Sequence, residues 1–530
     1  MAFNLIQAGS ALYSVNPGGA ASTALTLPSG VTLATNRIPR FARFKNYIVV
    51  VNTPSRPLSV DTSGTVRLLT PDPPGAAPVL AGTSGGSLTG TFVVKATNVY
   101  VDAIGNLIAE SDYSDLSNAA TIRAQWLQAS NVAASTDANV AARRLYRTTD
   151  NGGTFFDWID LSGNTATTII DDTPDASLGV VGADPRGSAP DLTLVAEWYG
   201  RVWGVSRTDY DNLRYTEAGA MYAWFADNSI PISHVGDDRF GITALAPRRD
   251  ALGVGRRNQI TQVTSSDGLA FLPAIVTENC GIISQESVIV YRDAVFFLWL
   301  DGVYRWDADG VTCISDKGNV RSWFATDNYF NRGMFSLAFA CFDPVNLRYR
   351  LFLCSAGNVV PDRWVEFDMN SGRWYGPHKT DAFSPRSAFM MRGVNDQAYA
   401  VVGSYDGYLS LDTETRTDWG NVAIVEDVTT KQFHGGDPNR STMFGKIYCF
   451  GEPQPKSLVT PPVLQIAASV GELDAPDQTT AMKWDLTKGR ESQFRIGEGK
   501  HATLRFTNAQ VGVNPVIYGF TIPIADLGTR

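Results

Sequence analysis

Short runs of alternating apolar and polar residues recur along this chain of 530 residues. They are rich in β-branched and aromatic residues, as in Tyr47–Val51 and Tyr349–Leu353. Turn dipeptides such as Asn151-Gly152 separate them and supply the positive φ angles that tight hairpins need. Helical periodicity is nearly absent, and its best candidate is Asp137–Tyr146. The sequence therefore predicts an all-β fold.

A strand–turn–strand unit repeats along the middle of the chain. It first appears as Leu194–Val205, and four further units start near Ile242, Val288, Leu337 and Ala388. The starts are about 46 to 51 residues apart, and each unit has room for four short strands. This spacing is typical of β-propeller blades, and an earlier unit over Arg40–Val60 brings the predicted number to about six. The alternative is two or three packed β-sandwiches.

The stretch over 74–185 differs in character from these units. It follows the Pro-rich linker Pro71–Pro78 and continues with strand and hairpin signals. About 105 residues suit one fibronectin type III or immunoglobulin-like β-sandwich. Such a domain is expected as an insertion between the first and second blades, at a loop edge where insertions are tolerated.

The predicted domain organisation follows from these units. We expect an N-terminal segment over 1–36, a first propeller blade over 37–73, the inserted sandwich over 74–185 and the remaining blades over 186–441. Alternating runs near 494–506 and 515–522 predict a C-terminal β-module over 442–530 that packs on the propeller or closes it.

The charge balance and the apolar runs argue against several classes of protein. Lys plus Arg number 44 and Asp plus Glu 53, so the net charge of −9 argues against a basic groove that grips nucleic acid. The N-terminus makes a poor signal peptide because no Lys or Arg precedes its apolar residues. Charged residues interrupt the strongest apolar stretch, Val288–Trp306. We therefore expect synthesis in the cytoplasm and no membrane segment.

Cysteine and histidine give no sign of a disulfide framework or of a metal site. The cysteines are odd in number, form no C-x-x-C pair and are expected to be reduced residues of the core. The histidines lie far apart and match no zinc-binding spacing. These residues are Cys280, Cys313, Cys341, Cys354, Cys449, His234, His378, His434 and His501. No metal and no cofactor are expected.

One short motif fits the Asp-box of sialidase-like propellers. It covers Thr148–Phe155, with Asp150 expected to cap backbone N–H groups and the glycines expected to take positive φ. Asp-boxes are structural turns where they occur, and this single copy falls in the expected sandwich. We interpret it as a hairpin turn.

Other acidic residues could bind a metal ion or act in catalysis only if their carboxylates lay at specific distances from one another. Asp301, Asp307 and Asp309 cluster as Ca²⁺ ligands do, but they lack the spacing of a calcium loop, and polar turns explain them. The pairs Asp171-Asp172 and Asp237-Asp238 would need carboxylates about 5 to 9.5 Å apart to act as a glycosidase. No nucleophile elbow or phosphate-binding loop is present. We therefore predict no enzyme activity, no catalytic residue and no binding residue.

Three phrases of the sequence resemble the nozzle, or tail-hub, proteins of tailed bacteriophages, especially the short-tailed ones. They are Gly302–Trp306 with Ile314–Gly318, RRLYRTTDNGGTFF over 143–156, and Gly499–Phe506 with Ile517–Phe520. The resemblance covers most of the chain. The family has no catalytic motif to carry over, so the resemblance implies no active site.

The resemblance implies a structural role in the virion. Such proteins form a ring, commonly a hexamer, below an adaptor or head-to-tail connector ring. They carry tail fibres or spikes, and genomic DNA leaves through the channel without specific binding. Assembly would take place in the host cytoplasm. A net negative charge suits a conduit, because carboxylates repel phosphates within a Debye length of about 8 Å.

Two other classes of function stay open. A glycan-binding or glycan-cleaving propeller at the bacterial surface, adhesin-like or sialidase-like, would use the Asp-box and exposed aromatic rings. A protein-interaction scaffold in the cytosol is the third possibility. The tryptophans at blade-like positions are expected to fill cores instead: Trp198, Trp203, Trp299, Trp306, Trp374 and Trp419.

Overall fold

A computed structural model gives the structure of most of the chain. It describes residues 4–16, 22–182, 187–233, 240–317, 320–379, 384–392, 398–405, 409–411, 426–430, 432–434, 440–451, 453–454, 462–471, 478–510, 513 and 517–526. The chain divides into two compact units. The first comprises Met1–Pro377 and Ser387–Ala400, and the second comprises His378–Arg386 and Val401–Arg530.

Antiparallel β-sheets make up nearly all of the regular secondary structure in the described residues, and the predicted all-β class is confirmed. Within the described ranges the one α-helix is α1 (Arg321–Ala325). Short 3-10 helices are η1 (Asp175–Ser177), η2 (Gln285–Ser287), η3 (Ile314–Asp316) and η4 (Arg332–Leu337).

The helical candidate Asp137–Tyr146 is wrong, because a strand, β12 (Ala142–Thr148), occupies its second half. The carboxylate of Asp137 accepts a hydrogen bond from the backbone N–H of Asn139 at 2.9 Å and holds a turn before the strand. Arg143 and Arg147 are buried on the same face as Leu145. Charged residues at core-facing positions hide the period of two that would have identified the strand.

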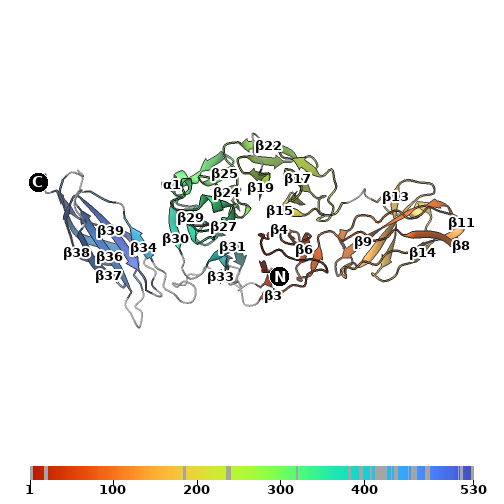
Figure 1. Ribbon diagram of the computed structural model, residues 1–530, viewed down its shortest axis with the longest axis horizontal. Helices are drawn as coiled ribbons and strands as arrows, with labels where there is room; N and C mark the ends of the chain where they lie inside the picture. The colour runs from red at the N-terminus through yellow and green to blue at the C-terminus, as the bar shows by residue number, and fades with distance from the viewer. Residues whose placement is uncertain are drawn as a thin grey trace. The chain divides into compact units, whose positions relative to one another are not determined.

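Five four-stranded antiparallel meanders follow one another in the described part of the first unit, and their strands pair in chain order (Figure 1). Meander 1 is β4 (Arg40–Phe44), β5 (Tyr47–Val51), β6 (Leu58–Asp61) and β7 (Val66–Leu68). Meander 2 is β15 (Leu192–Trp198), β16 (Arg201–Ser206), β17 (Asn212–Tyr215) and β18 (Ser229–Pro231). Meander 3 is β19 (Ile242–Pro247), β20 (Leu252–Arg256), β21 (Ile260–Thr264) and β22 (Leu272–Thr277).

The last two meanders continue the series. Meander 4 is β23 (Ile289–Tyr291), β24 (Ala294–Trp299), β25 (Gly302–Asp307) and β26 (Gly310–Cys313). Meander 5 is β27 (Phe339–Asp343), β28 (Arg348–Leu353), β29 (Arg363–Asp368) and β30 (Trp374–Lys379). A three-stranded sheet of β31 (Pro385–Arg392), β32 (Ala398–Ser404) and β33 (Leu409–Leu411) follows in the chain.

The first strands of the meanders lie side by side in chain order. Contacts join β4 to β15, β15 to β19, β19 to β23 and β23 to β27. Apolar cores fill the space between successive meanders: Trp203 and Leu245 share one core, and Phe296 and Leu351 share another. Burial of these side chains supplies the main stabilisation of the unit.

The tryptophans expected to fill cores do so where the structure describes them. Trp198, Trp203 and Trp306 are buried. Trp299 and Trp374 are partly buried, and their indole N–H groups donate to the carbonyls of Arg257 and Ile314. Trp419 lies outside the described residues.

Two further sheets stand between meanders 1 and 2 in the chain and share one core. One sheet orders β10 (Leu107–Glu110), β9 (Val94–Val101), β12 and β13 (Phe155–Ser162). The other orders β14 (Ile169–Asp171), β11 (Ala120–Ser130) and β8 (Val79–Phe92). Phe92, Leu127 and Leu145 belong to the core between them. We call residues 79–171 the sandwich.

A separate apolar cluster fixes the sandwich to the meanders. Tyr100 and Val140 of the sandwich share this cluster with Phe44 of meander 1 and Val202 of meander 2. The side-chain amide of Asn98 also donates to the carbonyl of Asp72 at 2.8 Å. The sandwich is therefore docked by buried apolar side chains as well as tethered by the chain.

The N-terminal strands and the second unit complete the described structure. Strands β1 (Asn4–Ala8), β2 (Ala11–Val15) and β3 (Ser22–Ala24) form a sheet, and Leu12 of β2 packs with residues of meander 1. The second unit contains β34 (Glu426–Thr429), β35 (Thr442–Gly451), β36 (Val463–Gly471), β37 (Gln478–Asp485), β38 (Arg490–Gly499), β39 (His501–Asn508), β40 (Ile517–Thr521) and β41 (Ile524–Asp526). One sheet orders β34-β39-β36-β37, the other orders β38-β35-β40 with β41 paired to β35, and they share one core.

Candidate functional site

Arg40, at the start of β4, joins three meanders through one side chain. Its Nε donates to Oε1 of Glu286 at 2.7 Å, and its Nη1 donates to the carbonyl of Thr193 in β15 at 2.9 Å. Glu286 lies in η2, the turn that leads into β23. The side chains of Arg40 and Glu286 are only 21% and 17% exposed. A charge-assisted pair at this burial is stronger than a surface ion pair.

The residues around Glu286 make further bonds to neighbouring meanders. The hydroxyl of Ser284 donates to the carbonyl of Ala338, directly before β27, at 2.7 Å. The side-chain amide of Gln285 donates to the carbonyl of Leu245 at 3.0 Å and accepts from its N–H at 2.6 Å. We call residues 284–287 the inner segment. It is tied to meanders 1, 3 and 5 by hydrogen bonds in which nearly every partner is buried or half-buried.

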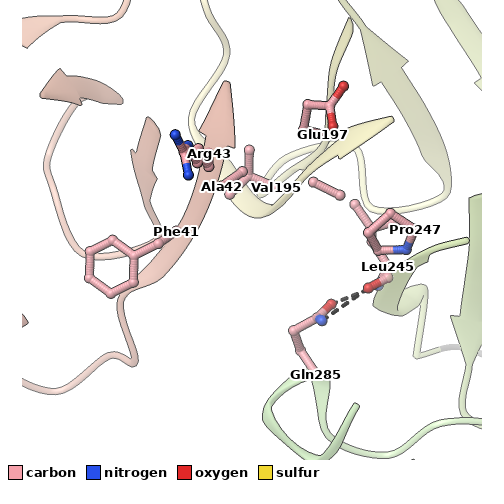
Figure 2. A pocket seen from close by; sticks show the side chains of 9 residues that line it. Phe41, Ala42, Arg43, Val195, Glu197, Leu245, Pro247 and Gln285 are labelled. Carbon is pink, nitrogen blue, oxygen red and sulfur yellow. Dashed lines mark hydrogen bonds between the residues drawn. The ribbon is translucent and has the colours of Figure 1, made fainter. Parts of the chain in front are cut away.

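A cavity of about 300 Å³ opens beside the inner segment (Figure 2). Its walls come from β4, β15 and β19, with Gln285 at one side, and the lining residues are Phe41, Ala42, Arg43, Val195, Ala196, Glu197, Leu245, Pro247 and Gln285. Gln285 is held in place by the two bonds to Leu245 that Figure 2 marks. The first strands of three meanders thus create a hollow that no single meander contains.

The lining of this cavity offers binding groups but little for acid–base chemistry. Arg43 and Glu197 supply one positive and one negative charge, and Phe41 supplies an aromatic ring. The carboxylate of Glu197 already accepts a hydrogen bond from the backbone N–H of Gly200 at 3.1 Å. No Ser, Cys, His, Lys or Tyr is among the lining residues, so the cavity holds no nucleophile–base pair.

The structure places the Asp-box in the turn between β12 and β13, as the hairpin interpretation predicts. Asp150 accepts a hydrogen bond from the backbone N–H of Thr91, on β8, at 2.8 Å. The expectation about the glycines is wrong, because Asn151 takes the positive φ of 53° and neither Gly152 nor Gly153 does. The glycine that this turn requires is Gly90 on β8, because a Cβ atom at that position would lie only 2.4 Å from Oδ1 of Asp150.

The acidic cluster of meander 4 is engaged in polar turns. Asp301 accepts from the hydroxyl of Tyr304 at 2.9 Å and pairs with Arg321. Asp307 pairs with Arg305 at 2.5 Å and accepts from the backbone N–H of Asp309 at 3.0 Å. Over the described ranges, no group of three or more His, Cys, Asp or Glu side chains is placed to hold a metal ion.

The acid pair Asp171-Asp172 holds the sandwich together. Asp171 accepts from the indole N–H of Trp158 at 2.8 Å and from the backbone N–H of Thr173 at 2.7 Å. Asp172 accepts from the backbone N–H groups of Ser87 and Leu88. The bond from Ser87 is the main reason that the pKa of Asp172 lies below its usual value. The second pair, Asp237-Asp238, lies outside the described residues.

The cysteines behave as core residues. All five lie in the described ranges and none forms a disulfide. Four are buried, whereas Cys313 is partly exposed. Burial raises the pKa of Cys280 to about 11 and that of Cys354 to about 12, so both thiols are neutral at neutral pH.

The histidines form no common site in the described ranges. The rings of His434 and His501 are 6.2 Å apart, and Nδ1 of His434 lies 3.1 Å from the carbonyl oxygen of Lys500. His378 belongs to β30, and His234 lies outside the described residues.

Sequence reasoning missed Arg40, Glu286 and the cavity. The available signal was the run Ser284–Ser287, a polar stretch without Gly or Pro directly before an apolar strand. A surface turn of that kind usually contains Gly, Pro, Asn or Asp. The partners of the run are far away in the chain, so no local pattern points to them.

Comparisons with known proteins do not assign this chain to a family. No family model matches it, and no curated protein does either. Among solved structures it is similar to one titled "Crystal structure of Kluyvelomyces marxianus Hsv2", with 10% identity and a TM-score of 0.25. That match covers 55% of this chain and 82% of the other. A likeness at this TM-score carries no argument about fold or function.

None of the helices in the described ranges has both the length and the apolar character that crossing a bilayer requires.

Proposed function

We propose that this chain is a structural protein of a bacteriophage virion, the subunit of the ring-shaped nozzle or hub of the tail through which DNA is ejected. The proposal includes a finer fold: the meanders are blades of a propeller with about six blades. It also includes an inserted fibronectin-III-like or immunoglobulin-like sandwich and a C-terminal β-module. The phrases Gly302–Trp306 and 143–156, which resemble the family, lie in β25 and around β12.

The observation that carries the proposal is the fixed attachment of the sandwich to the meanders. Tyr100 and Val140 are buried together with Phe44 and Val202, so the two parts share a core. A part of a virion that must hold its neighbours in fixed positions needs such rigid docking, because domains joined by small polar interfaces move relative to one another. The scarcity of acid–base groups in the cavity points the same way.

The partners follow from the same proposal. Copies of the chain close into a ring, commonly a hexamer, that attaches to an adaptor or head-to-tail connector protein and carries tail fibres or spikes. DNA passes without specific binding, and the charge of −9 disfavours adhesion of phosphates. The protein is part of the virion and assembles in the host cytoplasm.

The glycan alternative receives less support. It relied on a single Asp-box, which lies in the sandwich rather than in a meander, and on aromatic rings, of which Trp198, Trp203 and Trp306 are buried. A sugar-stacking ring must be exposed.

Mass spectrometry of purified virions, combined with antibody labelling in electron microscopy, tests the proposal. We expect the chain in the virion, label at the distal end of the tail, and no hydrolysis of host polysaccharides by the purified protein. Absence of the chain from virions would exclude the nozzle, and polysaccharide hydrolysis would favour the alternative.

A further inference from the structure

One face of the sheet β14-β11-β8 points away from the core of the sandwich. Leu80, Leu127 and Ala129 face that core, and successive residues of a strand point to opposite faces. Residues that pair across strands share a face. The pairs that alternate with the core residues are Val79 with Ser130, Ala81 with Gln128, Gln128 with Ile170, and Thr83 with Trp126. We call these seven residues the Trp126 face.

The Trp126 face is open to solvent. Val79, Trp126 and Ile170 are 46%, 40% and 44% exposed. The apolar cluster that docks the sandwich on the meanders takes its sandwich residues from β9, β10 and the turn before β12, with Tyr100 and Val140 among them. The face is therefore not used for that docking, and three large apolar side chains exposed on one face mark a contact surface.

The indole of Trp126 is backed closely by two glycines of β8. A Cβ atom at Gly86 would overlap Cδ1 of Trp126, and one at Gly85 would lie 3.1 Å from its Nε1. The backbone N–H of Ser87 donates to Oδ1 of Asp172 at 2.8 Å, which anchors this part of β8 to the chain that follows β14. Because backbone supports the ring from behind while the rest of it is exposed, the ring is preorganised for a ligand.

The face also offers neutral hydrogen-bonding groups that the chain itself leaves unused. Within the described ranges, neither the indole N–H of Trp126 nor the side-chain amide of Gln128 has a hydrogen-bond partner. The indole donates only, whereas the amide both donates and accepts. None of the seven residues carries a charge, and Arg123 of β11 lies outside the paired rows that form the face.

We propose that the Trp126 face binds a neutral carbohydrate chain. A sugar ring presents C–H groups on its faces, which stack on an aromatic ring, and hydroxyls at its rim, which need neutral donors and acceptors. Trp126 supplies the ring, and Gln128 supplies the polar group in the adjacent row. An anionic ligand would find no cation among the seven residues and would be repelled by the net charge of −9.

The size of the face favours a sugar over a protein as its ligand. A stable protein partner buries about 20 to 30 residues a side, and this face has seven. A small ligand needs only an apolar platform and a few well-placed polar groups. The site serves binding alone, because none of its residues has a carboxylate and glycoside hydrolysis takes a pair of them. It is thus distinct from a glycan-cleaving propeller, and it does not depend on the proposed virion role.

The test applies the purified full chain to an array of neutral hexose and N-acetylhexosamine oligosaccharides and measures the strongest binder by isothermal titration calorimetry. We expect Trp126→Ala to raise the dissociation constant by about tenfold or more, as loss of a central tryptophan usually does. Gln128→Leu keeps the size of the side chain and removes its hydrogen bonds, so it should raise the constant by about threefold or more. An apolar partner would instead bind Gln128→Leu at least as well as the parent.

The matched control is Tyr329→Ala, because Tyr329 is an aromatic residue that is 51% exposed and lies outside the sandwich. This variant should bind the oligosaccharide like the parent. Tryptophan fluorescence gives a second readout, since the change in emission on binding should be smaller in Trp126→Phe than in the parent. Equal thermal midpoints of the variants will verify folding.

Three results would overturn the inference. One is a parent that binds no oligosaccharide of the array, and another is Trp126→Ala binding like the parent. The third is a change of oligomeric state in Trp126→Ala without sugar binding by the parent, because a second copy would then cover the face.

The outcomes separate this inference from the proposed function. A chain that occurs in virions but binds no sugar leaves the nozzle standing and removes the carbohydrate site. A chain that binds sugar through Trp126 but is absent from virions does the reverse.

Discussion

Arg40 and Glu286 form a mostly buried ion pair across 246 residues of sequence, with 2.7 Å between Nε and Oε1. The pair belongs to no single sheet, because Arg40 begins meander 1 and Glu286 precedes meander 4. The ion pair therefore stabilises the arrangement of separate meanders rather than any one sheet. Removal of one partner would leave the other charge half-buried and unpaired.

We expect Arg40→Met to destabilise the first unit by about 2 to 4 kcal/mol, because it keeps the apolar stem and leaves the carboxylate of Glu286 without its cation. Urea unfolding followed by tryptophan fluorescence measures the change. In Arg40→Met/Glu286→Gln the loss should be smaller than in Arg40→Met alone, since no buried charge remains. The control is Arg305→Met, whose ion pair with Asp307 is more exposed and is worth under about 1 kcal/mol. If Arg40→Met and Arg305→Met lower the free energy of unfolding equally, the Arg40–Glu286 pair stabilises the unit no more than an exposed ion pair does.

Gly90→Ala should destabilise the sandwich by about 2 kcal/mol or more. Its φ of 147° disfavours a side chain, and the new Cβ atom would lie 2.4 Å from Oδ1 of Asp150, which must then move away from the N–H of Thr91. Gly153→Ala is the matched control, because no atom lies within 4 Å of its Cβ position. Thermal unfolding measures the stability of the two variants. A Gly90→Ala variant as stable as Gly153→Ala would contradict this account of the turn.

Release of the sandwich should follow from Val140→Asp. Val140 is buried in the cluster that joins the sandwich to meanders 1 and 2, and a carboxylate there lacks a partner. We expect limited proteolysis to cut the linker 71–78 several-fold faster than in the parent. Ile104→Asp serves as the control because Ile104 is exposed on the same sandwich. Unchanged cleavage in Val140→Asp would mean that the shared core does not fix the sandwich.

Alkaline pH should destabilise the core around Cys280. The pKa of this thiol rises from 9.0 to about 11 on folding, chiefly because burial disfavours the thiolate. The raised pKa means that the contribution to stability is complete below pH 9 and is lost as the pH rises from about 9 to about 11. Cys280→Ala should flatten this part of the stability profile measured by urea unfolding. A profile with the same slope in both proteins would exclude Cys280 as its source.

The strands were predictable because their signal is local. Tyr47–Val51 and Tyr349–Leu353 lie in β5 and β28, where alternation and β-branched or aromatic residues reflect packing against adjacent meanders. The helix expected over Asp137–Tyr146 failed for a different reason. Arg143 and Arg147 occupy core-facing positions. Arg147 pairs with Asp175 at 2.9 Å, and Arg143 donates to backbone carbonyls such as that of Val132 at 3.1 Å. A buried arginine looks like a surface residue until its partner is known.

The candidate site was less predictable than the fold. The cavity needs Phe41, Glu197 and Leu245, which come from three meanders, and its shape depends on how their first strands lie side by side. The bonds of Gln285 to Leu245 likewise join residues of different turns and strands. Sequence periodicity reports which face of a strand is buried, but it does not report which other strand the face meets.

The long separation between Arg40 and Glu286 also sets the order of events while the chain is being made. A ribosome adding about 5 to 20 residues per second needs about 12 to 50 s to cover the 246 residues between them. During that interval the sandwich, whose strands pair within residues 79–171, has its whole sequence available, whereas meander 1 waits for the inner segment. Translation therefore completes residues 79–171 before it reaches the inner segment, whose Glu286 pairs with Arg40 of meander 1.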